Sequence, residues 1–218
     1  MQTMNVRRVP GVLLCAAFGL LAAQVGFSQE KQSGTEPKKP SQAQPGGQEE
    51  EMMKKWMEAA TPDENHAKLK PLEGTWVTAV KMRFMPDAPF TENTGTLTRK
   101  WIMDGRFLME EAIGDPSPPM NMAFHGMGWV GYDKVIKKYT FAWVDNMGTC
   151  IYTGEGTCDG SGKTFNFTGQ FNDPMTGQLK KMRTVMTLVN DTKHTYESYD
   201  VGPDGKEYCC FQMTCTRK

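Results

Sequence analysis

The strongest constraint on the fold is a period of two that runs from Gly74 to the end of the chain. Apolar and polar residues alternate over ten short segments, which is typical of β-strands because successive side chains point to opposite faces. Turn-forming residues separate nearly all of these segments, so an antiparallel barrel or sandwich is expected. The expected strands are Thr75–Met85, Thr94–Met103, Phe107–Ile113, Phe124–Tyr132, Tyr139–Asp145, Thr149–Cys158, Thr164–Phe171, Leu179–Val189, His194–Val201 and Glu207–Thr216.

The alternation also indicates which side chains share a face. In the first expected strand, Trp76 and Val80 lie on one face, with Lys81 and Arg83 on the other. Several later strands likewise carry large aromatic side chains on one face. A barrel of ten strands is wide enough that such side chains need not fill it. The sequence is therefore compatible with an internal cavity.

Residues 1–28 have the composition of a secretory signal peptide. Arg7 and Arg8 give a positive start, an apolar stretch covers residues 12–25, and small residues precede a cleavage point near Ser28. We therefore expect an exported protein, periplasmic or extracellular. The apolar stretch is shorter than the roughly 20 residues that a membrane span needs, so no integral membrane segment is expected in the mature protein.

Two further segments lead to the barrel. Residues 29–50 are rich in Gln, Pro, Gly, Ser and Lys, and such a composition predicts a disordered linker because it buries too little apolar surface to offset the entropy of ordering. Residues 51–73 predict short helices that flank the barrel domain, residues 74–218. The second helix is expected to start at Thr61-Pro62, as N-cap and first helical residue. The first is indicated by apolar residues at helical spacing: Met52, Met53, Trp56, Met57 and Ala60.

The charge of the chain argues against a nucleic-acid partner. The formal net charge is zero, with 25 basic and 25 acidic residues, and loss of residues 1–28 would remove two arginines and no acid. A slightly acidic mature chain lacks the basic surface that binding to nucleic acid requires. The expected partner is instead a small apolar ligand.

The cysteines do not predict a disulfide framework. Cys150 and Cys158 bound one expected strand, which would hold them about 26 Å apart. A disulfide requires Cα atoms within about 7 Å. Cys209 and Cys210 are adjacent, so they would point to opposite faces of a strand. The redox state stays open for the cysteines that follow the signal segment, namely Cys150, Cys158, Cys209, Cys210 and Cys215.

A first resemblance rests on Gly74-Thr75-Trp76 at the start of the first strand and on Arg217 at the end of the last. This pair resembles the lipocalin-type (calycin) arrangement, in which a tryptophan at the closed end of the barrel is covered by an arginine from the final strand. A guanidinium over an indole gains cation–π energy while its N–H groups bind nearby carbonyls. The resemblance implies that Trp76 and Arg217 form a barrel-closing pair.

A second resemblance covers nearly the whole region from Glu51 to Lys218. The order of its motifs resembles a bacterial family known as domain of unknown function 1579. The resemblance implies a lipocalin-like barrel and supplies no catalytic residues. The motifs are Leu72-Glu73-Gly74-Thr75-Trp76, Asp104-Gly105-Arg106-Phe107-Leu108, Gly131-Tyr132-Asp133, Trp143-Val144-Asp145, Asp173-Pro174-Met175-Thr176-Gly177 and Pro203-Asp204-Gly205-Lys206-Glu207.

Neither a cofactor nor a metal is expected. The nitrobindin-type barrels also have ten strands and hold haem through a histidine near the C-terminus, whereas the last histidine here is His194 and the final expected strand has none. His66, His125 and His194 lack the spacing of metal ligands, and no Cys-x-x-Cys motif occurs. His194 lies beside Asp191 at the start of a strand, which predicts a hydrogen bond within the turn.

The leading functional hypothesis is a non-catalytic barrel that holds a small apolar or amphipathic ligand. Arg183 would be its polar anchor, although the alternation of its strand equally allows an outward, solvated Arg183. The expected ligand-lining residues are Trp101, Met109, His125, Trp129, Trp143 and Arg183.

Two alternatives remain open at this stage. The first is an enzyme that uses the same cavity, with His125 or Glu111 as general base. His125 shares a face with Met127 and Trp129, and Glu111 is either buried or at the barrel rim. The second is a non-catalytic interaction module that uses its linker and its outer surface.

Overall fold

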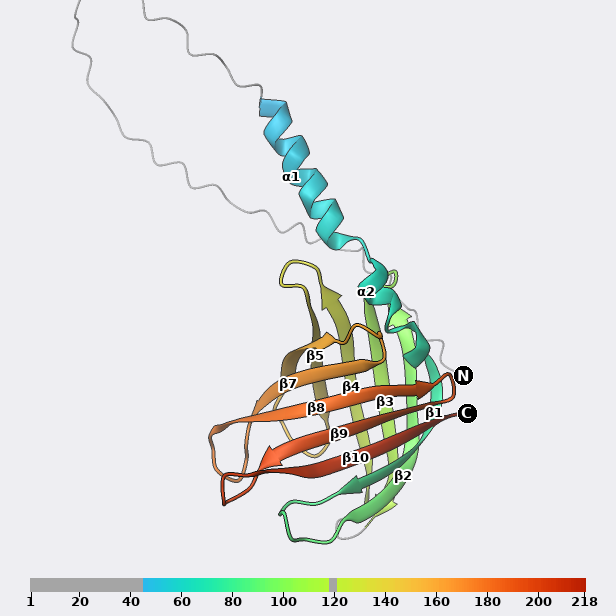
Figure 1. The fold of residues 1–218 in the computed structure, drawn as a ribbon, viewed down its shortest axis with the longest axis vertical. Helices are drawn as coiled ribbons and strands as arrows, with labels where there is room; N and C mark the ends of the chain where they lie inside the picture. Colours follow the sequence, from blue (N-terminus) through green and yellow to red (C-terminus); the bar gives the residue numbers. More distant parts are fainter. Residues whose placement is uncertain (1–44, 118–120) are drawn as a thin grey trace, which may run out of the picture. The chain divides into compact units, whose positions relative to one another are not determined.

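The computed structural model describes residues 45–117 and 121–218, so the expected signal peptide and most of the expected linker lie outside the described residues. Ten antiparallel strands pair in chain order, and β10 pairs with β1 to close the barrel (Figure 1). The predicted all-β, ten-stranded antiparallel barrel is confirmed. The strands are β1 (Gly74–Met82), β2 (Thr91–Ile102), β3 (Phe107–Ser117), β4 (Met122–Asp133), β5 (Lys138–Asp145), β6 (Tyr152–Cys158), β7 (Thr164–Asn172), β8 (Leu179–Asn190), β9 (Lys193–Val201) and β10 (Glu207–Arg217).

β2 starts three residues earlier and β3 ends four residues later than the sequence-based prediction. Two other strand ends fall three residues short of it, and in both places a side chain holds the backbone in a turn. β1 ends at Met82 because Arg83 binds the carbonyl of Cys209 at 2.9 Å and that of Pro86 at 2.6 Å. β6 begins only at Tyr152. The loop before it starts with a turn in which the N–H of Met147 donates to Asp145 Oδ1 at 2.9 Å.

Three short elements precede the barrel: α1 (Pro45–Ala60), α2 (Glu64–Ala67) and the 3-10 helix η1 (Lys70–Leu72). α1 starts inside the segment expected to be linker, and its apolar residues stay exposed, from 58% for Met57 to 73% for Trp56. α2 is capped by Asp63, not by Thr61, because the Asp63 carboxylate accepts the N–H groups of Asn65 and His66. No helix in the described part of the chain combines the length and the apolar character needed to cross a membrane.

One end of the barrel interior holds the larger hydrophobic core. This closed half holds a cluster of nine buried side chains, two of which, Leu69 and Leu72, enter from the segment before β1. Trp76, Leu97 and Cys215 form a second buried cluster. Such burial of large apolar side chains is the main source of stability in a barrel of this size. The nine are Leu69, Leu72, Leu108, Val130, Tyr139, Phe165, Phe167, Met186 and Leu188.

The other end of the interior keeps contact with solvent. This open half is formed by inward-facing apolar side chains that are only partly buried. Each lies an even number of residues from a buried residue of its own strand, which places it on the inner face. The open half comprises Val80, Phe124, Trp143, Tyr152, Phe171, Met182 and Phe211.

Candidate functional site

One row of paired residues crosses five neighbouring strands, from β2 to β6, and reaches into the open half. Arg99 pairs with Glu110, Glu110 with Gly128, Gly128 with Trp143, and Trp143 with Tyr152. Directly paired residues point to the same face of a sheet, so all five face the interior. The row therefore places a charged pair next to two aromatic side chains on the inner wall.

Arg99 is the centre of a buried polar network. Its Nε lies 2.8 Å from Glu110 Oε2, its Nη1 lies 2.9 Å from His194 Nε2, and its Nη2 donates to the Tyr196 hydroxyl at 2.6 Å. Only 2% of Arg99 is exposed. A buried guanidinium is tolerated when its donors are satisfied and a carboxylate balances its charge, and the network meets both conditions.

The protonation states of the network follow from burial and neighbouring charges. Burial and the cations of Arg99 and Arg217 lower the pKa of His194 to about 3, so its imidazole is neutral. Nε2 therefore accepts from Arg99, and the proton sits on Nδ1. Burial opposes the charge of Arg99, but Tyr196 and Glu110 raise the pKa of the guanidinium above its ordinary value. Burial also raises the pKa of the Tyr196 hydroxyl.

The histidine in this network carries a buried donor that has no partner among the described residues. His194 Nδ1 is inaccessible to solvent and makes no hydrogen bond to any described residue. The imidazole packs edge-to-face against the Trp76 indole, with ring centroids 4.2 Å apart. His194 was expected to bind within its turn, and that expectation is wrong because the ring points across the barrel to Arg99.

Glu110 and Tyr196 are the partly exposed members of the network, and Glu110 is the charged one. Its side chain is 20% exposed, whereas that of Arg99 is 1% exposed. Oε2 accepts from Arg99, and no hydrogen bond of Oε1 occurs within residues 45–117 and 121–218. A carboxylate has lone pairs for several donors, so Glu110 presents a hydrogen-bond acceptor to the inner side of the barrel wall.

Trp143 lies flat against the inner wall because two glycines make room for it. A Cβ atom at Gly126 would lie 2.2 Å from the indole, and one at Gly128 would lie 2.7 Å from it. The indole Nε1 donates to Asp145 Oδ2 at 3.0 Å, and the Phe124 ring stacks parallel to the indole at 6.4 Å. The face of the indole is thus held toward the interior, next to Glu110.

The barrel-closing pair lies at the opposite end of the interior. The Arg217 guanidinium stacks over the Trp76 indole at 4.2 Å. Its nitrogens donate to the carbonyls of Pro71, Glu73 and Asp191, each at 2.9 Å. The pair therefore ties the segment before β1 and the β8–β9 turn to the end of β10.

The six expected ligand-lining residues lie on both faces of the barrel wall. Trp101 and Trp143 face inward, and Trp101 packs against the core of the closed half. The expectation that Met109, His125 and Trp129 line the interior is wrong, because all three face outward. The reason is that Gly126, Gly128 and Val130 take the inner face of β4, where the ring of Trp143 fills the space beside the glycines.

Arg183 also faces outward, as the alternative for this residue allowed. Its guanidinium binds both carboxylate oxygens of Glu207, at 2.9 and 2.6 Å, and stacks over the Tyr199 ring at 3.9 Å. These contacts lie on the outer wall of β8–β10. Arg183 is therefore not a polar anchor inside the barrel.

The expected general bases lie on the outer wall as well. His125 Nε2 is 2.9 Å from Glu111 Oε1, and their side chains are 51% and 41% exposed. Neither faces the interior, so the prediction that His125 or Glu111 serves as a base in an internal cavity is wrong. The pair adjoins a set of exposed apolar side chains on β3–β5: Phe107, Ile113, Met127, Trp129 and Val144.

Sequence reasoning missed the four residues of the buried network. Arg99 lies between Leu97 and Trp101 on the inner face of β2. An arginine that alternates with large apolar residues could therefore have predicted a buried charge. Glu110 and Tyr196 gave no comparable indication, because both faces of their strands carry apolar residues.

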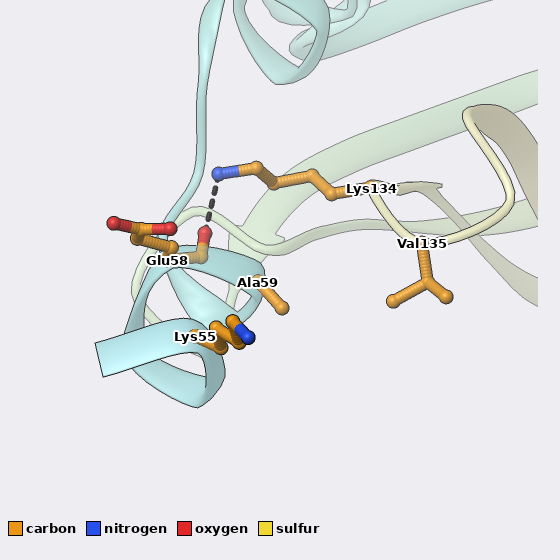
Figure 2. A pocket seen from close by; sticks show the side chains of 5 residues that line it. All are labelled: Lys55, Glu58, Ala59, Lys134 and Val135. Atoms are coloured by element: carbon orange, nitrogen blue, oxygen red, sulfur yellow. Dashed lines mark hydrogen bonds between the residues drawn. The ribbon is translucent and has the colours of Figure 1, made fainter. Parts of the chain in front are cut away.

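Two shallow hollows lie on the outside of the molecule. Figure 2 shows the first, about 440 Å³, where Lys134 donates a hydrogen bond to the Glu58 carbonyl at the end of α1. The second, about 470 Å³, is lined mainly by outward residues of β5–β8 such as Thr153, Glu155 and Lys181. In the described part of the chain no group of three or more His, Cys, Asp and Glu side chains is placed to hold a metal ion, and the five cysteines there are free.

Comparison with known proteins adds the family and the fold. The chain is similar to the crystal structure of Rv2717c from M. tuberculosis, with 12% identity, a TM-score of 0.52, and coverage of 72% of this chain and 99% of that chain. It is also similar to a redesigned beta barrel, b11L5F_LGL, with 15% identity, a TM-score of 0.37, and coverage of 69% of this chain and 95% of that chain. At these identities the first likeness shows a shared fold alone.

No curated protein matches the chain. The model of one protein family matches residues 61–217, which include α2, η1 and the whole barrel. The chain belongs to the family described as Protein of unknown function (DUF1579).

Proposed function

We propose that the protein binds a small amphipathic ligand in the open half of the barrel. The observation that carries the proposal is that the inward apolar side chains of the open half are partly exposed, whereas the closed half contains a continuous core of nine buried side chains. Leaving large rings in contact with water costs free energy. A concave wall of such rings with a few polar groups is the usual form of a small-molecule site.

The polar groups of the interior support an amphipathic ligand over a purely apolar one. Solvent reaches the Glu110 carboxylate, which lies midway along β3. Thr184 and Ser198 add a pair of hydroxyl groups, 2.9 Å apart, on β8 and β9. The apolar part of the ligand would contact Phe124, Trp143 and their neighbours, and its polar end would reach Glu110.

A pair of substitutions on β1 tests this proposal. Val80→Trp would add an indole to the open half, whereas Ala79→Trp would add the same group to the outer face one residue away. The neutral dye N-phenyl-1-naphthylamine, which fluoresces in apolar surroundings, is the probe. Wild type and Ala79→Trp should bind the dye, and Val80→Trp should lose most of the affinity. Equal affinity in all three proteins would contradict a site in the open half.

Export is also part of the proposal, and it rests on the composition of residues 1–28 alone. Expression of the full chain in a host with an export system, followed by fractionation and N-terminal sequencing, tests it. A mature N-terminus near Ser28 outside the cytosol is the expected result. An uncleaved chain in the cytosolic fraction would contradict it.

A further inference from the structure

We infer that the ligand of the open half carries a positively charged amine at its polar end, and that a carboxylate is disfavoured there. The inference rests on the proposed function and deepens it. Three features of the inner wall support it: the pairing of its basic groups, the Glu110 oxygen that Arg99 does not bind, and the position of the Trp143 indole.

The basic side chains at inward strand positions of the described chain are already bound. Arg99 binds Glu110, His194 and Tyr196 and is 2% exposed. Lys180 Nζ lies 2.5 Å from Asp200 Oδ2 on the neighbouring strand. Arg217 lies over Trp76 and binds three backbone carbonyls at the closed end. A ligand carboxylate in the open half would therefore have to share a cation whose charge a protein carboxylate already balances.

Glu110 offers what an ammonium group requires. Its Oε1 makes no hydrogen bond to another described residue, and its side chain is partly exposed to the interior. Charge-assisted hydrogen bonds from an ammonium to a carboxylate are roughly twice as strong as neutral ones. An amine bound here would donate to Oε1 of Glu110, while Oε2 stays bonded to Arg99.

The Trp143 indole lies on the other side of the same position. Glu110 and Trp143 both pair with Gly128, and the indole lies over that glycine, because a Cβ atom there would be 2.7 Å from the ring. Strands lie about 4.8 Å apart, so the Cα atoms of Glu110 and Trp143 are separated by roughly 10 Å. A cation over the inward face of this indole would also be within reach of the Glu110 carboxylate on the next strand but one, and cations bind tryptophan better than the other aromatic rings.

A second carboxylate adds negative charge at this part of the wall. Asp145 Oδ2 accepts the indole N–H of Trp143, and its side chain faces inward two residues along β5. The charge of Arg99 is balanced by Glu110, so Asp145 leaves a surplus of one negative charge here. This surplus attracts a cationic ligand and repels a carboxylate.

Three amphiphiles of equal chain length test the inference by calorimetry with the purified protein at neutral pH, below their micellar concentrations. Decylammonium should bind about tenfold more tightly than decanol, and decanoate should bind most weakly. If decanol or decanoate binds most tightly, the inference is wrong and the proposed function stands. If none of the three binds, the proposed function fails as well.

A matched pair of variants then assigns the polar end to Glu110. Glu110→Gln should reduce the affinity for decylammonium to that for decanol, whereas Glu111→Gln, one residue away on the outer face, should leave it unchanged. Because Glu110→Gln leaves Arg99 without a charged partner, its fold is checked by circular dichroism. If it does not fold, Asp145→Asn is tested in its place, and this variant should selectively weaken the binding of decylammonium. An unchanged ranking in the folded variant would overturn the inference.

Discussion

The closed and open halves of this barrel are built from the same kinds of side chain and differ in what covers them. Phe165 and Phe171 lie on the inner face of the same strand, yet Phe165 is fully buried and Phe171 remains partly exposed. The closed half receives Leu69 and Leu72 from the segment before β1, which complete its core. The comparison teaches that this barrel wall becomes a core where a further segment supplies apolar side chains, and that elsewhere its inward side chains stay partly exposed.

The buried network marks the border between the two halves. His194 contacts Trp76 of the closed half, whereas Glu110 is reached by solvent. Arg99 connects the two through its bonds to both residues. The network therefore has a structural side and an accessible side, and substitutions on the two sides should have different consequences.

The largest expected contrast is between Phe165→Ala and Phe171→Ala. Loss of the buried ring should reduce the free energy of unfolding by about 4 kcal/mol, because it leaves a cavity in the core. Loss of the partly exposed ring should cost about 1 kcal/mol, because less of its apolar surface is removed from water when the chain folds. Urea unfolding of the two variants measures both values. Similar losses at the two positions would show that the open half is packed like the closed half.

Removing the centre of the network should have the next largest effect. Arg99→Met should destabilise the fold by about 3 kcal/mol, because it leaves Glu110 without its cation and His194 Nε2 without its donor. Replacing both charged residues, Arg99→Met with Glu110→Met, should recover much of the loss because no buried charge remains. A double variant less stable than Arg99→Met alone, in urea unfolding, would argue against the ion pair as the cause.

The pH dependence of stability reports on His194. Folding lowers its pKa from 6.5 to about 3, so below pH 6.5 the unfolded chain binds a proton that the folded chain does not. This contribution to stability is complete above pH 6.5 and is lost as pH falls toward 3, by about 1.4 kcal/mol per pH unit. His194→Gln keeps an acceptor for Arg99 and cannot titrate. Urea unfolding between pH 5 and pH 7 gives the slope of the free energy of unfolding against pH. In this variant the slope should correspond to about one fewer proton taken up on unfolding.

The smallest expected effect compares two arginines that stack on aromatic rings. Arg217→Met should cost about 1 kcal/mol, because Arg217 covers Trp76 and binds three backbone carbonyls at the closed end. Arg183→Met should cost less, because its pair with Glu207 lies on the exposed outer wall. Thermal unfolding compares the two variants. A larger loss of stability in Arg183→Met would show that the contacts on the outer wall of β8–β10 contribute more to stability than the barrel-closing pair.

The strands could be predicted from the sequence because each depends on local alternation and on the turns beside it. The inner face of β4 could not, because its large residues Met127 and Trp129 point outward and its glycines point inward. That choice depends on Trp143 of the next strand, whose ring occupies the space beside the glycines. A rule that places large apolar residues inside fails where a neighbouring strand supplies the ring.

The candidate site could be predicted only in part. Trp143 was identified because it alternates with other aromatic residues on β5, but Glu111 was considered in place of Glu110. β3 carries apolar residues on both faces, so alternation alone does not decide between adjacent acids. The contact of Arg99 with His194 joins residues 95 positions apart, and no pattern within one strand reports it.

The most direct test of the account is a crystal structure of the protein in complex with whichever of the three amphiphiles binds most tightly. The account predicts ligand density in the open half, with the chain against Trp143 and Phe124, the polar end at Glu110, and the closed half unchanged. Density on the outer wall, with the open half filled by the protein's own side chains, would contradict it.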